Sequence, residues 1–385
     1  MPLPLITGLG ILTCIGDSPD TFWESMVQGR CGIKKIDLFD TSRYYSDSAG
    51  TIPAFSAQTN RARVFVRHAA LQALMDAKID NSDLSGSRAK IFIGSAHGDL
   101  NGWMAFLDGT STDNRFSITC LADELAKALT VSLPAEFIST ACTSSTIALG
   151  IAKQSIENGE TDIAIVCGVD VVSEFILAGF CSLRAISKSV CKPFDKDRDG
   201  LMLGEGAGCV ILESRSHVEK RGFARSYGSL AGFGASSDAV HLTAPDRVAS
   251  GAVSCIRKAL KEADVVPEQV DYINAHGTGT RYNDQMECVA IKKIFGDHAT
   301  KIPVNSIKSA IGHTSGACGV IEAVLLCLSM RHNFIPGTCN LEVPMPGFSF
   351  LFVKKGMPFS ATVAVSMNSA FGGNNACIVV KRDLS

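Results

Sequence analysis

The chain turns from an apolar segment into a helix at Ile138-Ser139-Thr140-Ala141-Cys142-Thr143-Ser144-Ser145. An apolar run with helical periodicity follows at 146–156, so the pattern predicts a buried strand, a sharp turn with one cysteine, and a helix. Unpaired amide N–H groups and the helix dipole at such a start favour a thiolate over a thiol, which makes Cys142 a candidate nucleophile. A buried structural cysteine is the alternative for this stretch alone.

Strand-like apolar runs alternate with helix-like segments along the rest of the chain. Several of these runs, such as 162–168, are apolar on both faces, which is typical of a sheet covered by helices on both sides. We therefore expect an α/β fold. Because the pattern begins again near residue 224, we expect two successive α/β halves, residues 1–223 and 224–385. The expected strands are 3–8, 90–94, 162–168, 209–212, 227–233, 272–275, 302–305, 350–353 and 361–365, and the expected helices are 18–29, 61–78, 121–129, 146–156, 249–263, 284–295 and one from 320.

The composition excludes several classes of function. A formal charge of −2 over 385 residues gives no electrostatic footprint for nucleic acid. Fourteen cysteines without a C-x-x-C pair, and eight histidines without metal-ligand spacing, predict no metal site. No segment is long and uncharged enough to span a bilayer. Dispersed cysteines and a start without a basic n-region favour the cytoplasm.

A charge-rich turn at 192–200 leads into a glycine-rich segment at 204–208. The glycine spacing fits neither the dinucleotide fingerprint nor a P-loop, because no Lys-Ser/Thr pair follows. We expect these glycines to allow close backbone packing instead.

Three motifs in the second half supply what a cysteine nucleophile needs. Residues 274–280 place His276 at a strand end, and residues 305–313 place Lys308 and His313 at another. Residues 368–375 surround Phe371 with glycines and small polar side chains. Taken singly, each histidine is more often structural, the lysine an ion-paired residue and the phenylalanine part of the core.

Together with the cysteine block and residues 193–208, these motifs resemble the elongating β-ketoacyl-(acyl-carrier-protein) synthases of the thiolase superfamily. The resemblance extends from about residue 5 to residue 381. It implies a thiolase-like fold in which two similar α/β halves form αβαβα layers. It also implies a decarboxylative Claisen condensation, in which an acyl chain on cysteine is extended by a malonyl thioester.

The resemblance assigns roles to individual residues. Cys142 matches the nucleophile, and His276 and His313 match the pair that stabilises the malonyl-derived enolate. The backbone N–H groups of Cys142 and Phe371 match the oxyanion hole, and Phe371 also matches a gate beside the cysteine.

Five further residues complete the site that the resemblance implies. Thr278 and Thr280 would hydrogen-bond the phosphopantetheine arm, and His241 resembles a position near its channel. Lys308 would orient the site, paired with Glu322, and a purely structural ion pair is compatible with this role.

The resemblance further implies acyl-carrier protein as partner and no cofactor beyond its phosphopantetheine. It implies a homodimer, or a heterodimer with a related ketosynthase or chain-length-factor subunit. The chain departs from the family in a shorter 94–138 segment, in 366–370 and in Arg281-Tyr282. These departures favour a specialised relative acting on polyketide or aryl-polyene chains and leave acyl-chain length open.

Three alternatives share the fold. A degradative thiolase would carry a second catalytic cysteine in a Cys-x-Gly context, whereas Cys377 is followed by Ile378 and Val379. A silent chain-length partner would not need Cys142 with two histidines. An initiating synthase would use Cys-His-Asn.

Overall fold

Eleven strands form one continuous mixed sheet in the order β13-β11-β10-β15-β16-β9-β1-β8-β6-β4-β5. The structure, a computed structural model, describes residues 3–56, 58–223 and 225–383. The strands of this sheet are β1 Leu5–Thr13, β4 Ala89–Gly94, β5 Ala135–Ile138, β6 Ile163–Asp170, β8 Gly206–Glu213, β9 Ser229–Ser237, β10 Tyr272–Asn274, β11 Pro303–Asn305, β13 Leu351–Phe352, β15 Val363–Ser369 and β16 Asn374–Lys381. Shorter strands are β2 Lys34–Lys35, β3 Ser48–Gly50, β7 Leu203–Gly204, β12 Phe334–Ile335 and β14 Met357–Pro358.

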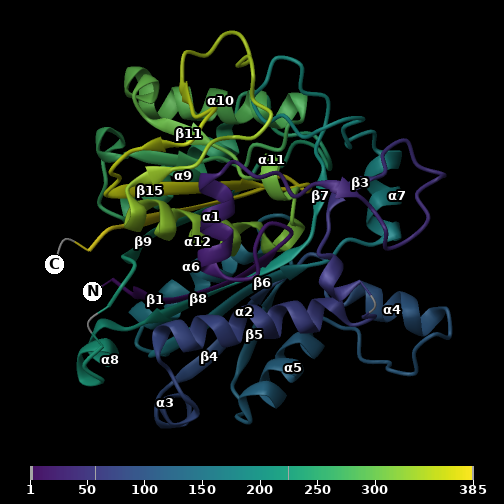
Figure 1. Ribbon diagram of the computed structural model, residues 1–385. Helices are drawn as coiled ribbons and strands as arrows, with labels where there is room; N and C mark the ends of the chain where they lie inside the picture. The colour runs from purple at the N-terminus through teal and green to yellow at the C-terminus, as the bar shows by residue number, and fades with distance from the viewer. Residues whose placement is uncertain (1–2, 57, 224, 384–385) are drawn as a thin grey trace.

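The helices form layers on both sides of the strands, so the α/β class is confirmed (Figure 1). They are α1 Pro19–Val27, α2 Arg61–Ala77, α3 Asn81–Gly86, α4 Leu100–Leu107, α5 Thr119–Leu129, α6 Ser144–Glu157, α7 Glu174–Ser182, α8 Arg215–Lys220, α9 Ser250–Glu262, α10 Arg281–Phe295, α11 Lys308–Ile311 and α12 Cys318–His332. Helix α2 packs on β1, β8 and β6 with α5 beside it, and α9 packs on β9 and β16 with α10 beside it. Helix α6 contacts β4 and β6 near one end of the sheet and β9 and β16 in the other part. Helix α12 likewise contacts β6 and β8 as well as β15 and β16, so both helices lie between the two parts of the sheet. The result is the αβαβα layering expected of a thiolase-like fold.

The two ends of the sheet come from different parts of the sequence. Strands between residues 5 and 213 form one end, strands between 229 and 381 form the other, and Leu5 of β1 pairs with Ser229 of β9 where they meet. Residue 224, at which the sequence places the boundary between halves, lies outside the described residues. Helix α12 is buried from Cys318 to Met330, because strands and helices of both ends surround it.

Two sequence-based expectations for strands are wrong. Strand β1 continues to Thr13 through Gly8 and Gly10, where a Cβ atom would lie only 2.1 Å and 1.9 Å from carbonyl oxygens of α2. These glycines allow the helix to approach the strand and do not end it. Strand β16 was not expected, because the expected strands end at residue 365. Its buried apolar run pairs with β15 and β9. Helices α4 and α7 were also not expected.

Three parallel strands bring their carboxyl ends to one edge of the sheet. Strand β4 lies between β5 and β6, with Gly94 opposite both Ile138 and Gly168. The segments after these strands, including the Cys142 turn, therefore meet in space. A Cβ atom on Gly94 would lie 2.4 Å from the backbone of Ser145, so α6 begins directly against β4.

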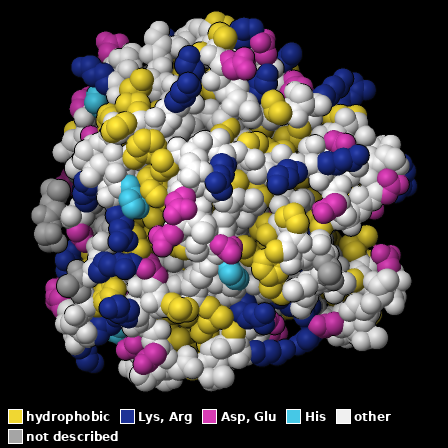
Figure 2. Space-filling view, in the orientation of Figure 1, with side chains coloured by type: hydrophobic (Ala, Val, Ile, Leu, Met, Phe, Trp, Pro, Cys, Tyr) yellow, Lys and Arg dark blue, Asp and Glu magenta, His cyan; other side chains and the backbone are white. Residues whose placement is uncertain are grey.

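Charges of both signs are interspersed with apolar side chains on the face shown in Figure 2. This distribution agrees with the small net charge of the chain. Among the described residues, no helix has both the length and the apolar character required to cross a membrane.

We predict that Gly94→Ala lowers the free energy of unfolding by about 2 kcal/mol or more, because the new methyl group would overlap the α6 backbone. Urea denaturation followed by circular dichroism measures the change. Gly86→Ala is the control, because its Cβ meets no atom within 4 Å, and it should leave the stability unchanged or slightly higher. Equal stability of the two variants would contradict the proposed close contact.

Candidate functional site

The Cys142 turn connects β5 to α6 through a strained residue. Ala141 has a φ of +54°, a left-handed backbone conformation that residues other than glycine rarely adopt. The Ser144 hydroxyl donates to the Ala141 carbonyl at 2.6 Å and accepts from the Thr140 N–H at 2.9 Å, which holds the turn closed. The half-buried Cys142 lies at the wall of a cavity of about 340 Å³.

The pKa of Cys142 shifts in the direction opposite to the one that a helix start favours. Burial raises the pKa of the Cys142 thiol, the neighbouring Cys318 adds to this effect, and the Lys308 ammonium opposes it only in part. Helix α6 begins at Ser144, two residues after the cysteine. Loss of solvent therefore outweighs the helix start in its effect on the pKa of Cys142, and the thiol form is favoured.

The two predicted histidines meet at Cys142. The Cys142 Sγ atom and one ring nitrogen each of His276 and His313 lie within 4.8 Å of one another. The two imidazole rings are 5.2 Å apart between centroids and nearly perpendicular. His276 and His313 lie 134 and 171 positions after Cys142 in the sequence, and the fold brings all three to one point.

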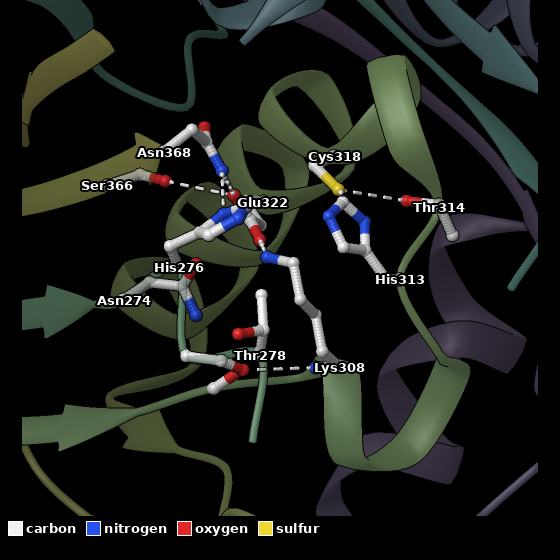
Figure 3. A network of polar contacts seen from close by, with 12 residues as sticks. Asn274, His276, Thr278, Lys308, His313, Thr314, Cys318, Glu322, Ser366 and Asn368 are labelled. Atoms are coloured by element: carbon white, nitrogen blue, oxygen red, sulfur yellow. Dashed lines mark hydrogen bonds and ion pairs between the residues drawn. The ribbon is translucent and has the colours of Figure 1, made fainter. Parts of the chain in front are cut away.

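Hydrogen bonds define the tautomer of His276 (Figure 3). The Glu322 carboxylate accepts a hydrogen bond of 2.7 Å, so the Asn368 atom facing it is the amide nitrogen. The same NH₂ group lies 3.2 Å from His276 Nδ1 and donates to its lone pair. The ring proton of neutral His276 is therefore on Nε2.

His313 has the same tautomer for a different reason. The backbone N–H of Ser315 donates to His313 Nδ1 at 3.0 Å, and the Cys318 thiol lies 3.3 Å from the same nitrogen. Gly312, with a φ of +78°, precedes the histidine. The His313 N–H donates to the Met202 carbonyl at 2.7 Å, which ties this turn to the first half of the chain.

Both histidines are neutral N–H donors. Burial lowers the pKa of His276 and of His313, and the positive charge of Lys308 lowers both further. Each ring keeps a proton on Nε2 and presents it as a donor, and this geometry suits an oxygen atom on which negative charge develops.

The side chains of Cys142, His276 and His313 are close enough to one another to act as ligands of a metal ion, although the sequence predicts no metal site. A metal-bound histidine donates its other ring N–H to an acceptor. Here Nδ1 of each histidine faces N–H donors, so a metal on Nε2 would place two donors against each other. The hydrogen bonds fit a thiol and two N–H donors better than a metal centre.

Lys308 and Glu322 form the predicted ion pair, with 2.6 Å between Nζ and Oε1 and both side chains only 2% exposed. Burial alone would lower the pKa of Lys308, but the Glu322 carboxylate outweighs it and the pKa is raised. Lys308 therefore stays charged. Burial raises the pKa of Glu322, and the ammonium opposes this rise.

The cavity beside Cys142 includes Thr278, Thr280 and Phe371 in its lining. The two threonine hydroxyls lie 2.9 Å apart, and the Phe371 ring stacks on Phe180 at 5.7 Å between centroids. His241 does not line this cavity. Its Nδ1 accepts the backbone N–H groups of residues 243 and 244, which do line it.

Sequence reasoning missed the buried acids that hold the histidine turns. Glu287 accepts the N–H groups of His276 and Gly277, both at 2.7 Å, and burial raises its pKa to about 8. Asp284, one turn earlier in α10, accepts the N–H group of Gly279 in the same turn at 3.2 Å and that of Phe194 at 2.8 Å. The available signal in the sequence was the pair of acids, three residues apart, in the helix that follows the predicted His276 turn.

Asp170 was also missed, and it links two loops of the site. Its carboxylate accepts the N–H groups of Ala96 at 2.9 Å, His97 at 3.0 Å and Gly316 at 2.5 Å. An acid at the end of an otherwise apolar strand, β6, was the signal for it.

Comparisons with known proteins agree with this geometry. The family model described as the beta-ketoacyl synthase N-terminal domain matches residues 5–217, and that of the C-terminal domain matches residues 227–342. A 3-oxoacyl-[acyl-carrier-protein] synthase 2 of Coxiella burnetii is 35% identical, with 98% of each chain covered. The protein of the same name from Synechocystis is also 35% identical, covering 98% of this chain and 97% of its own.

Solved structures give the same result over the full length. A type II polyketide-synthase ketosynthase, solved with its acyl-carrier protein and bound to the hexaketide, superposes with a TM-score of 0.92 and 30% identity. The ishigamide ketosynthase/chain length factor superposes with a TM-score of 0.91 and 31% identity. Each comparison covers 100% of both chains.

The layers and the Cys-His-His site define a condensing enzyme of the thiolase fold. The chain belongs to the β-ketoacyl synthase family, an acyltransferase class that forms carbon–carbon bonds. The thiolase alternative is not supported, because Cys377 is fully buried in β16. The silent-partner alternative is not favoured, because all three reactive side chains meet.

We predict that Lys308→Met lowers the free energy of unfolding by about 3–5 kcal/mol, because Glu322 would keep a buried carboxylate without its counter-charge. Urea denaturation measures this loss. The double variant Lys308→Met/Glu322→Leu should recover most of it.

Lys196→Met is the matched control for this prediction. Lys196 pairs with Asp197 at the surface, and its loss should change stability by less than about 1 kcal/mol. If Lys308→Met were as mild as this surface substitution, the buried pair would not be the structural constraint described above.

Proposed function

We propose that this protein transfers an acyl chain from acyl-carrier protein to Cys142 and extends it with malonyl-carrier protein, giving 3-oxoacyl-carrier protein. The observation that carries the proposal is the convergence of one thiol with two neutral Nε2–H donors in a cavity. The names of the most similar relatives and structures support carrier-bound substrates.

The first step is acylation. The Cys142 sulfur attacks the thioester carbonyl, the bond from that carbon to the carrier sulfur breaks, and the carrier thiol leaves with the proton that Cys142 gives up. We assign the oxyanion hole to the backbone N–H groups of Cys142 and Phe371. Because Phe371 lines the cavity against Phe180, we also propose it as the gate.

The second step is decarboxylation of the malonyl thioester. Its bond to the carboxylate breaks, carbon dioxide leaves, and the electron pair forms an enolate whose oxygen carries negative charge. Two Nε2–H donors, from His276 and His313, stabilise this oxygen without needing to be protonated first. The enolate carbon then attacks the acyl group, and Cys142 leaves as a thiolate that takes a proton.

Thr278 and Thr280 are proposed to hydrogen-bond the phosphopantetheine arm, since both line the cavity. His241 is proposed to act near the channel through the loop that it orders. Lys308 and Glu322 are positioning residues that act through Asn368 on His276.

We propose further that no metal or resident cofactor takes part, because the acyl groups arrive on the carrier's phosphopantetheine. We also propose a dimer, either of this chain or with a related ketosynthase or chain-length-factor subunit, in the cytoplasm. Two structures similar to this chain contain a ketosynthase and a chain length factor. Residues 1–223 and 224–385 are proposed as the two thiolase-like halves.

We predict that incubation with acyl-carrier proteins adds one acyl mass to the protein, which Cys142→Ala abolishes. Intact-mass spectrometry detects the adduct. His313→Ala should keep most of the acylation but lose condensation with malonyl-carrier protein by at least about a hundredfold, because one of two enolate donors is gone.

One control variant and two contradicting outcomes complete the experiment. His332→Ala, which removes a histidine that stacks on Trp23, should change neither step. Absence of any adduct across short, long, saturated and unsaturated donors, with and without a partner subunit, would contradict the nucleophile assignment. Parallel loss of both steps in His313→Ala would contradict the division of labour.

A further inference from the structure

One thiol of this protein is exposed at the surface, far from the chemistry described above. All fourteen cysteines lie in the part of the chain that the structure describes, and all are free thiols. Cys31 is exposed, Cys14, Cys142 and Cys339 are half-buried, and the others are buried. Accessible thiols react with oxidants and disulfides in solution, whereas buried structural ones are inert. Cys31 is therefore the thiol that a reagent in solution reaches first.

The sulfur of Cys339 lies against the backbone that carries Cys31. The Cys339 Sγ atom is 3.6 Å from the Gly29 carbonyl oxygen and 3.9 Å from the Arg30 carbonyl oxygen. The second carbonyl group belongs to the peptide bond between Arg30 and Cys31, so the sulfur contacts the chain directly beside Cys31. Two thiols from opposite ends of the sequence are thus neighbours in the fold.

The backbone around Cys31 is anchored, but its side chain is held only weakly. The Gly32 N–H donates to the Ala310 carbonyl of α11 at 2.8 Å. The Cys31 thiol donates to the neighbouring Ser309 carbonyl at 3.5 Å. Because S–H is a weak donor, little free energy is lost when this contact breaks. The Cys31 side chain can therefore rotate toward Cys339 while Gly32 keeps the backbone in place.

Cys14 is the other thiol near Cys31, and it faces a different way. A Cβ atom on Gly32 would lie 2.5 Å from the Cys14 sulfur, which is also 3.8 Å from the Ile311 carbonyl oxygen. The pKa of Cys14 is raised to about 12 and that of Cys339 to about 11, in both cases first by burial and then by a negative charge on Cys31. Both thiols are thus close to Cys31, but the Cys339 sulfur is the one beside its peptide bond.

Positive charges surround the exposed thiol. Arg30 and Lys34 are exposed on either side of it in the sequence. The Lys34 ammonium opposes the rise in the pKa of Cys14 that burial causes, so it lies near this group of thiols. Positive charge attracts anionic reagents, and the surface therefore favours an anionic small-molecule disulfide as the reagent.

We propose that Cys31 and Cys339 form a reversible disulfide by exchange with an anionic small-molecule disulfide. Cys31 gives up its proton and attacks one sulfur of the reagent, whose S–S bond breaks, and one reagent thiolate leaves and takes up a proton. Cys339 then gives up its proton and attacks the Cys31 sulfur, and the second reagent thiolate leaves and takes up that proton. Two protein thiols are oxidised, and one reagent disulfide is reduced to two thiols.

This modification goes beyond the proposed function and does not depend on it. Neither Cys31 nor Cys339 lines the cavity beside Cys142. Acylation of Cys142 is measured separately, so the proposed function and the disulfide can fail independently.

Exposure to glutathione disulfide tests the modification. The full-length protein is incubated at about pH 8, where thiolates form, and intact mass is followed over time after free thiols are alkylated. Cys142→Ala is treated in parallel, so that an adduct on the cavity thiol is recognised. We expect a glutathione adduct on Cys31 that is replaced by a protein lighter by two hydrogens. Digestion should give a linked peptide pair containing Cys31 and Cys339, and dithiothreitol should restore both thiols.

Single substitutions separate the roles of the two cysteines. In Cys339→Ser the glutathione adduct on Cys31 should last about tenfold longer or more, because no neighbouring thiol displaces it. Cys31→Ser should form neither the adduct at this position nor the disulfide. Cys14→Ser is the matched control and should form the Cys31–Cys339 disulfide within about twofold of the unsubstituted rate. Unchanged circular dichroism shows that the serine variants are folded.

Three results would overturn the pairing. The first is an unsubstituted protein in which Cys31 does not react with glutathione disulfide. The second is an adduct on Cys31 that lasts as long in the unsubstituted protein as in Cys339→Ser. The third is a linked peptide pair that joins Cys31 to Cys14.

Discussion

The buried ion pair between Lys308 and Glu322 is the interaction on which the site depends. Two opposite charges removed from water are stable only when each is fully hydrogen-bonded, and Glu322 meets this condition through Lys308, Asn368 and Ser366. The carboxylate thereby orients the Asn368 amide, which orients His276. Replacing Lys308 or Glu322 changes the charge balance of the core and removes the contacts that orient the Asn368 amide toward the His276 ring.

Buried carboxylates also explain how two distant parts of the chain form one site. Glu287 binds the backbone of the His276 turn, and Asp170 binds the loop after β4 together with the turn after His313. Glycines make the remaining contact possible, because a Cβ on Gly204 would lie 2.1 Å from the Ile311 carbonyl oxygen. The expectation that residues 204–208 allow close packing is confirmed.

The sequence predicted the parts of this structure that depend on local pattern. Apolar periodicity gave most of the strands and helices, and the small polar residues around Cys142 gave the turn. It did not predict the raised pKa of Cys142, because burial arises from tertiary packing. It missed β16, because a glycine turn hid the strand after it. The anchoring roles of Glu287 and Asp170 were also missed, because the backbone N–H groups that they accept come from tertiary packing and the local sequence signals do not name these partners.

The central claim is that His276 and His313 are neutral and carry their protons on Nε2. Nitrogen-15 NMR of the protein labelled in its imidazole rings tests it most directly, with signals assigned from His276→Gln and His313→Gln. From about pH 8 down to about pH 6, where an unperturbed histidine would become largely charged, both rings should remain Nε2–H tautomers because their pKa values are lowered. A ring that carries protons on both nitrogens in this range, or a neutral ring with its proton on Nδ1, would contradict the account.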